Sequence, residues 1–211
     1  MQRLAVFDLD GTLVHSAPDL AAALNRRLAA AGLPPLTVAE VQPMIGDGAR
    51  RLLERGFAAR GAKVPPDALA AFLADPALEG GPLTAPFPGM AELLERLAAE
   101  GWRLAVCTNK PEGPARALLG RLGLARHLRA IGGGDSFAVR KPDPAHLLLT
   151  IGAAGGGRAV MVGDHQNDML AARGAGIPAI FVGWGYGPRQ MALGHPVVAD
   201  AAALHETLSA L

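Results

Sequence analysis

Hydrophobic residues follow two different periods along the chain, and the change between them divides the sequence. Between residues 16 and 82, apolar side chains recur every three or four positions, as Leu20, Leu24 and Leu28 do, which predicts amphipathic helices. Glycine and proline separate the further short helices that we expect at residues 38–41, 49–59 and 66–73. No strand-like alternation occurs between about residues 16 and 80. This part of the sequence therefore predicts a block built of helices alone.

A linker rich in turn residues, 79–89, introduces a different pattern in which short apolar runs alternate with helical segments. Strands are expected at residues 4–7, 103–107, 128–131, 159–162, 179–182 and 197–199. Helices are expected at residues 90–100, 114–122, 144–153 and 167–174. Strands that alternate with helices predict right-handed βαβ units and a parallel sheet.

The first strand belongs to this sheet although the helical block follows it in the sequence. The expected fold class is therefore α/β: a doubly wound parallel-sheet (Rossmann-like) core with an inserted α-helical cap domain. We expect the core to comprise residues 1–15 and 83–211 and the cap to comprise residues 16–82.

Composition narrows the class of protein without identifying a function. Half of the 211 residues are hydrophobic, 18% are charged, and the net charge is +1. This balance gives no reason to expect a nucleic-acid or membrane partner. The single cysteine, Cys107, has no partner for an internal disulfide, and the chain begins directly with a strand rather than a signal peptide. We expect a cytoplasmic protein.

Two acidic residues, Asp8 and Asp10, directly follow the first strand and precede Gly11 and Thr12. In extended backbone, residues two positions apart project to the same side, so the two carboxylates repel unless a cation or a shared proton compensates them. Ligands of open α/β sheets bind at such strand ends. The pair is therefore interpreted as a nucleophile and an acid/base beside a metal ion. A turn that merely closes the strand is the alternative.

A second pair of acids, Asp164 and Asp168, follows the apolar run 159–162. If all four carboxylates converge, a divalent cation and a lysine are needed to offset their repulsion, and oxygen ligands suit Mg²⁺. Lys141, which precedes a proline at the start of a helix, is the candidate lysine, with a solvated surface residue as the alternative. Thr108, at the end of the strand 103–107, can donate to a phosphate or can simply cap a turn.

These four segments resemble, in the same order, the four motifs of the haloacid dehalogenase superfamily, and the resemblance extends over essentially the whole chain. It implies phosphomonoester hydrolysis in which Asp8 is the nucleophile, Asp10 is the general acid and base, and Lys141 neutralises the transferring group. The phosphate-binding residues that it implies are Gly11, Thr12, Thr108, Asn109 and Lys141. The implied Mg²⁺ residues are Asp8, Asp10, Asp164 and Asp168, the last as a ligand or as a support for the ligands.

The expected cap contains a glycine-flanked loop in which Gly46, Gly48 and Arg50 are candidates for binding a small anion such as a carboxylate. The alternative is a connecting loop with solvated arginines. Together with residues 13–20, this loop resembles the phosphoglycolate phosphatase branch of the superfamily, which implies that a small phosphorylated metabolite, 2-phosphoglycolate, is the substrate of a monomer or homodimer. Phosphatases or phosphomutases acting on sugar phosphates, and a non-catalytic binding protein, are the alternatives.

Three further positions are interpreted individually. His15 stands where this branch commonly has an acid, which makes its role at the cap entrance an open question. His165 is expected to face solvent or to pack rather than to bind metal. The segment 183–187 has Gly-x-Gly-x-Gly spacing followed by Pro188, and is expected to be a loop near the cap rather than a dinucleotide-binding turn.

Overall fold

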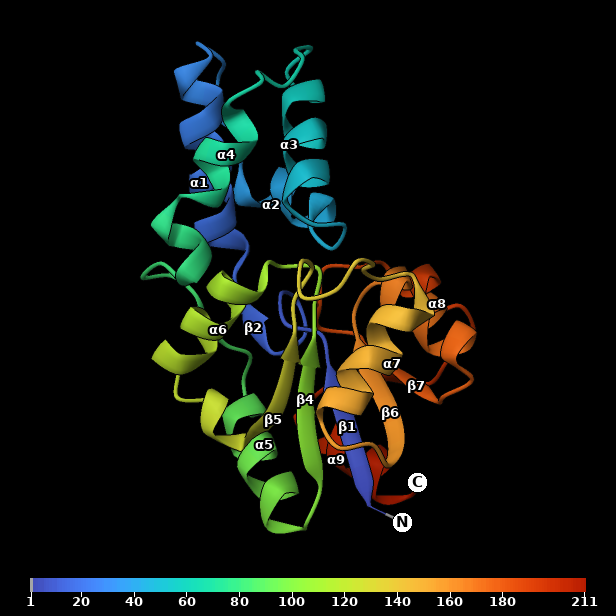
Figure 1. Ribbon diagram of the computed structural model, residues 1–211. Coiled ribbons are helices and arrows are strands. Elements are labelled where there is room, and N and C mark those ends of the chain that lie inside the picture. Colours follow the sequence, from blue (N-terminus) through green and yellow to red (C-terminus); the bar gives the residue numbers. More distant parts are fainter. Residues whose placement is uncertain (1) are drawn as a thin grey trace.

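A six-stranded parallel sheet forms the centre of the computed structural model, which describes residues 2–211. The strand order is β5-β4-β1-β6-β7-β8, so the first strand lies in the middle of the sheet. The strands are β1 (Arg3–Phe7), β4 (Arg103–Cys107), β5 (Leu128–Gly132), β6 (Arg158–Gly163), β7 (Ala179–Val182) and β8 (Val197–Val198). The α/β class expected from the sequence is confirmed (Figure 1).

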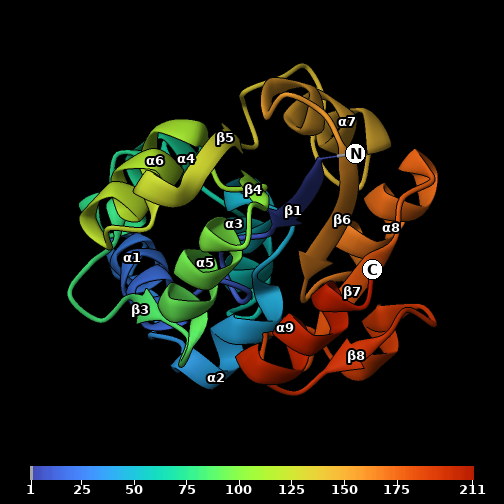
Figure 2. The same ribbon diagram turned by 90° about the horizontal axis from the view of Figure 1, so that it is seen from below.

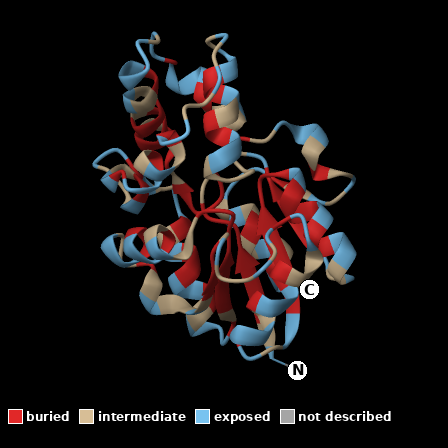
Figure 3. Ribbon diagram, turned by 45° about the horizontal axis from the view of Figure 1, so that its top comes forward, coloured by how far each residue is buried: buried red, intermediate tan, exposed pale blue. Residues whose placement is uncertain are grey.

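Helices cover both faces of the sheet (Figure 2). They are α5 (Met90–Ala99), α6 (Glu112–Arg121), α7 (Pro144–Ala153), α8 (Gln166–Ala175) and α9 (Ala201–Ser209). Alternate residues of β1 point to opposite sides: Ala5 and Phe7 pack with α5, α6 and α9, whereas Leu4 and Val6 pack with α7 and α8. The sheet is therefore buried between two helical layers, as its colouring in Figure 3 shows.

A separate group of helices lies beyond the carboxyl ends of the central strands (Figure 1). These helices are α1 (Ala17–Ala30), α2 (Val38–Val41), α3 (Ala49–Ala58) and α4 (Ala68–Leu73). They bury an apolar cluster of their own, with Leu24, Leu53 and Phe57 among its fully buried side chains. As the sequence predicts, no strand occurs from residue 16 to residue 80.

Two short strands that the sequence did not predict connect the helical group with the sheet. Residues Val14–His15 (β2) and Ala85–Pro86 (β3) pair in antiparallel register, so the outgoing and returning segments lie side by side. Strands of two residues are too short to produce a recognisable alternation in the sequence. The C-terminal helix α9 was also missed; Asp200 accepts a hydrogen bond from the N–H of Ala203 at its start.

Shorter elements complete the chain: the 3₁₀ helices η1 (Gln42–Met44), η2 (Pro76–Glu79), η3 (Ala125–His127) and η4 (Arg189–Ala192). Across residues 2–211, none of the helices combines the length and the apolar character that crossing a membrane requires.

Candidate active site

Three carboxylates from two strand ends converge beside the centre of the sheet. Asp8 follows β1, Asp164 follows β6, and Asp168 lies in the first turn of α8. Each offers an oxygen within 4.8 Å of the others, and all three side chains are buried. β1 and β6 are neighbours in the parallel sheet, which brings their carboxyl ends to the same edge.

Lys141 binds two of these carboxylates. Its Nζ lies 2.9 Å from Oδ1 of Asp8 and 2.6 Å from Oδ1 of Asp168, and its side chain is only 2% exposed. The loop that carries it is fixed by His146, whose Nδ1 accepts the N–H of Lys141 at 3.2 Å. The functional interpretation of this lysine, rather than the surface alternative, therefore fits its position.

Asp164 is oriented by two donors. The hydroxyl of Thr12 donates to Oδ1 at 2.9 Å, and the backbone N–H of Tyr186 donates to Oδ2 at 2.7 Å. Gly11 and Gly185 allow this close approach, because a Cβ at either position would collide with the Asp164 side chain. Gly11 also has a φ of +93°, a conformation that favours glycine.

Asp168 is oriented by the start of its own helix. Its Oδ2 accepts the backbone N–H of His165 at 3.0 Å, and Nδ1 of His165 accepts the N–H of Asn167 in return. The carboxylate thus lies at the positive end of the helix dipole as well as beside Lys141. His165 is buried, which confirms packing rather than solvent exposure as its setting.

The negative charge of these three carboxylates is not fully compensated by Lys141. Burial, together with the Asp168 carboxylate, raises the pKa of Asp8 to about 6 despite Lys141. Burial and the neighbouring Asp8 and Asp168 raise the pKa of Asp164 to about 8. Burial alone would lower the pKa of Lys141, but the adjacent carboxylates outweigh it and raise this pKa. One ammonium therefore does not compensate three carboxylates.

The donor set suits a divalent metal ion. Oδ1 of Asp8 is buried and, apart from its ion pair with Lys141, accepts no hydrogen bond from residues 2–211. Carboxylate oxygens at the edge of a cavity are ligands that a hard cation prefers. The three acids consequently fit a metal ion.

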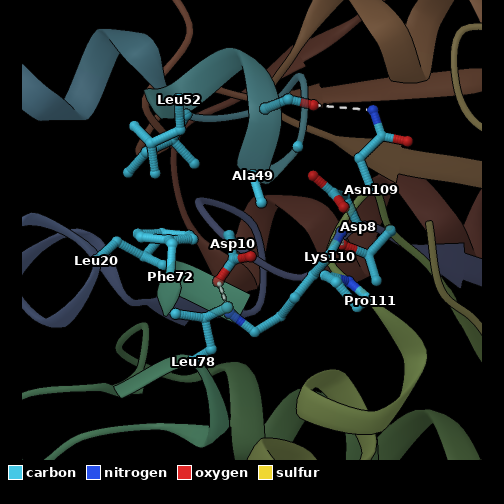
Figure 4. A pocket seen from close by; sticks show the side chains of 14 residues that line it. Asp8, Asp10, Leu20, Ala49, Leu52, Phe72, Leu78, Asn109, Lys110 and Pro111 are labelled. Carbon is cyan, nitrogen blue, oxygen red and sulfur yellow. Dashed lines mark hydrogen bonds and ion pairs between the residues drawn. The ribbon is translucent and has the colours of Figure 1, made fainter. Parts of the chain in front are cut away.

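Asp10 lies outside this three-carboxylate group. Its Oδ1 accepts the hydroxyl of Ser16 at 2.6 Å and lies 3.6 Å from Nζ of Lys110. The side chain also lines a pocket between the sheet and the helical group (Figure 4). The Asp10 side chain therefore faces this pocket and is not one of the three carboxylates that lie within 4.8 Å of one another.

The pocket has a polar side from the core and an apolar side from the helices. Asp8, Asp10, Thr108, Asn109 and Lys110 line the polar side. The apolar side is lined by Leu20, Ile45, Leu52, Phe72 and Leu78, which Figure 4 shows in part. A small anion bound at the polar side would be shielded from water by the helices.

The glycine-flanked loop of the helical group contacts the core directly. The Asn109 amide donates to the carbonyl oxygens of Gly46 at 2.9 Å and of Lys141 at 3.0 Å. The Asn167 amide donates to Oδ1 of Asp47 at 2.7 Å. Of the expected anion-binding residues, Gly46 and Gly48 line the pocket, whereas Arg50 is exposed and does not.

The loop 183–187 lies beside the entrance to the helical group, as expected from the sequence. The Tyr186 hydroxyl accepts the backbone N–H groups of Ser16 at 2.8 Å and Ala17 at 3.0 Å. It also lies 3.2 Å from Nδ1 of His15. Because the oxygen already accepts two hydrogen bonds, its proton is directed to His15, which therefore interacts with the loop rather than with the three carboxylates.

Sequence reasoning missed the roles of Lys110, Tyr186 and Asn167. Lys110 had a usable signal, since it is one of three lysines and directly follows Thr108 and Asn109. Tyr186 and Asn167 gave none, because their partners lie more than 100 positions away in the sequence.

Comparison with known proteins agrees with this arrangement. Residues 2–176 match the family model of the haloacid dehalogenase-like hydrolases. A phosphoglycolate phosphatase of Agrobacterium fabrum is 46% identical over 97% of this chain and 91% of its own, and one of Rhodospirillum rubrum is 47% identical over 88% and 81%. A solved structure from Haemophilus somnus, described as a predicted phosphoglycolate phosphatase, has a TM-score of 0.85 at 30% identity and covers 98% of this chain and 97% of its own.

Proposed function

This chain belongs to the haloacid dehalogenase-like hydrolases, and we propose that it is the family's phosphatase for 2-phosphoglycolate, acting through an aspartyl-phosphate. The observation that carries the proposal is the buried group of Asp8, Asp164 and Asp168 around Lys141. Asp8 of this group lines a small pocket. The substrate follows from relatives at 46% and 47% identity that are named phosphoglycolate phosphatases.

The first half-reaction transfers the phosphoryl group to the protein. A carboxylate oxygen of Asp8 attacks phosphorus, the bond between phosphorus and the ester oxygen breaks, and Asp10 gives its proton to the leaving alkoxide. Lys141 offsets negative charge on the phosphoryl oxygens. Gly11, Thr12, Thr108 and Asn109 complete the proposed phosphate site.

The second half-reaction returns the enzyme to its starting state. Asp10, now ionised, takes a proton from a water molecule that attacks phosphorus, and the acyl-phosphate bond breaks to release phosphate and the Asp8 carboxylate. The separation of Asp10 from the three-carboxylate group suits this exchange of a proton. A Mg²⁺ ion, held by Asp8 and Asp164 with Asp168 beside them, would supply further positive charge to the phosphoryl oxygens when bound.

We further propose a division into a catalytic core, residues 1–15 and 83–211, and a cap, residues 16–82. Both boundaries fall next to the β2–β3 pair, where two chain segments connect the parts. Opening at this pair would admit substrate, and closing would exclude water from the first step. We also propose a monomer or homodimer in the cytoplasm; the free, buried Cys107 is in keeping with that reducing compartment.

The test is phosphate release from a panel of phosphomonoesters in Mg²⁺, with the isosteric Asp8→Asn variant as the control. Preferred release from 2-phosphoglycolate, abolished in the variant, is expected. Sugar phosphates belong in the panel because a structure of CbbY from Rhodobacter sphaeroides in complex with xylulose-(1,5)bisphosphate is similar, with a TM-score of 0.78 at 25% identity over 96% of both chains. Preference for those esters would reassign the substrate. No release from any ester by folded protein would refute the phosphatase itself.

A further inference from the structure

Lys110 is a buried cation whose charged end faces the pocket. Its side chain is 4% exposed, and it lines the pocket together with Asp8 and Asp10 (Figure 4). Its Nζ lies 3.6 Å from Oδ1 of Asp10, which is an ion-pair distance but too long for a hydrogen bond. Within residues 2–211, no acceptor takes a hydrogen bond from this ammonium group, although it carries three donors.

The position of this cation relative to Asp10 matches the chemistry of a leaving group with an adjacent carboxylate. In 2-phosphoglycolate, a single carbon separates the ester oxygen from the carboxylate. A hydrogen bond of about 2.6–3.2 Å between Asp10 and the ester oxygen would bring that carboxylate within reach of a cation beside Asp10. Lys110 is the cation at that place.

The other residues around the pocket make Lys110 the only group suited to this task. It is the one cationic side chain among the pocket-lining residues that the structure describes, whereas Arg50, in the first turn of α3, is exposed and does not line the pocket. Apolar side chains such as Phe72 and Leu78 face Lys110 across the pocket. An ion pair in such surroundings is strengthened by the low local dielectric constant.

We propose that Lys110 is the specificity-determining residue that binds the leaving-group carboxylate of the substrate. The inference rests on the proposed phosphatase function and adds to it the basis of substrate choice. Esters whose leaving group has a carboxylate next to the ester oxygen receive a charge-assisted hydrogen bond. Esters with a hydroxyl in that place lack the opposite charge and gain less from the Lys110 ammonium.

The experiment compares two esters of equal length, 2-phosphoglycolate and ethyl phosphate, which differ in the carboxylate alone. In Lys110→Met, kcat/KM for 2-phosphoglycolate should fall about 10- to 100-fold more than kcat/KM for ethyl phosphate. The fold-loss of kcat/KM for 2-phosphoglycolate is divided by the fold-loss for ethyl phosphate. This division cancels any effect that Lys110 exerts through Asp10, because hydrolysis of both esters depends on that acid. Lys110→Gln, which keeps a donor but no charge, should show a smaller selective loss and serves if the methionine variant does not fold.

Arg50→Met is the comparison variant, since it removes the exposed cation in the first turn of α3. A selective loss in Arg50→Met and not in Lys110→Met would overturn the inference. An equal loss for both esters in Lys110→Met would also overturn it, and would assign Lys110 to positioning Asp10 while leaving the proposed function intact. Wild-type protein that hydrolyses ethyl phosphate but does not prefer 2-phosphoglycolate would refute both the substrate and the role of Lys110. Protein that hydrolyses neither ester nor any other would refute the phosphatase function first.

Discussion

The backbone N–H of Tyr186 donates to Oδ2 of Asp164 at 2.7 Å, while its hydroxyl accepts the first two N–H groups at the start of the helical group, those of Ser16 and Ala17. One loop residue thus connects a carboxylate of the candidate metal site with the segment through which the chain enters the helical group. If this segment moves relative to the core, either these hydrogen bonds break or Tyr186 moves together with the segment.

Tyr186→Phe should destabilise the protein without removing the hydrogen bond to Asp164, because that bond uses the backbone. The variant leaves two buried N–H groups without their acceptor, which costs about 1–3 kcal/mol of unfolding free energy. Urea denaturation measures this loss. His15→Ala is the comparison: it removes only the acceptor of the Tyr186 proton at a half-buried position, so a smaller loss is expected. Equal losses would contradict this account.

Asn167→Asp should weaken closure of the cap. The substitution replaces the amide that donates to Oδ1 of Asp47 with a second carboxylate, so attraction becomes repulsion. We expect KM to rise about 10-fold, equivalent to roughly 1.4 kcal/mol, with the helix start itself intact because an acid is favourable there. Steady-state kinetics provide the measurement.

Asp47→Asn in the same background should recover much of this loss, since it removes one of the two facing charges. An unchanged KM in Asn167→Asp, or a failure of the second substitution to restore it, would show that this contact does not control closure.

The metal-free protein should become less stable as pH rises through the range in which its carboxyl groups titrate. The ordinary pKa of an aspartate is 3.8, whereas the folded protein raises that of Asp8 to about 6 and that of Asp164 to about 8. Between these values the folded chain holds protons that the unfolded chain has lost. The stabilising contribution is therefore complete below pH 3.8 and is lost as pH rises through about 6 and about 8.

Denaturation in a chelator at a series of pH values measures how the free energy of unfolding changes with pH. Asp164→Asn should remove the decrease expected around pH 8. Adding a divalent cation should stabilise the protein more at pH 8 than at pH 5, because fewer protons must leave before it binds. An equal effect of the cation at both pH values would contradict the assignment of Asp8 and Asp164 as its ligands.

Gly185→Ala should weaken metal binding although residue 185 binds no metal itself. A Cβ at this position would collide with the side chain of Asp164, so the carboxylate must move. We expect an apparent metal affinity lower by about 10- to 100-fold, measured by titrating Mg²⁺ against activity or thermal stability. Gly113→Ala, in α6 where an added Cβ meets nothing within 4 Å, is the matched control and should bind metal normally.

Most of the sheet and the identity of the main acids could be predicted from the sequence. The central strands β1, β4 and β6 contain continuous apolar runs, and each is followed by a polar residue at the carboxyl edge of the sheet: Asp8, Thr108 and Asp164. Asp8, Asp164 and Asp168 could therefore be assigned to one site before any distance was known, whereas Lys141 was added through the resemblance of its motif to the family's. The structure brings all four together. The exclusively helical character of residues 16–80 followed in the same way from the spacing of their apolar side chains.

The part played by individual side chains around that site depended on tertiary structure. Asp10 shares its motif with Asp8, yet its carboxylate turns to Ser16 and Lys110 rather than to the three-carboxylate group. Arg50 lies in the first turn of α3 and is exposed, and Tyr186 connects Asp164 with a segment some 170 positions away. Local sequence determines which face of a strand or helix is apolar, because that choice depends on a repeat of two or 3.6 residues. Which polar groups then meet depends on how the loops fold over the sheet, and no local repeat encodes those contacts.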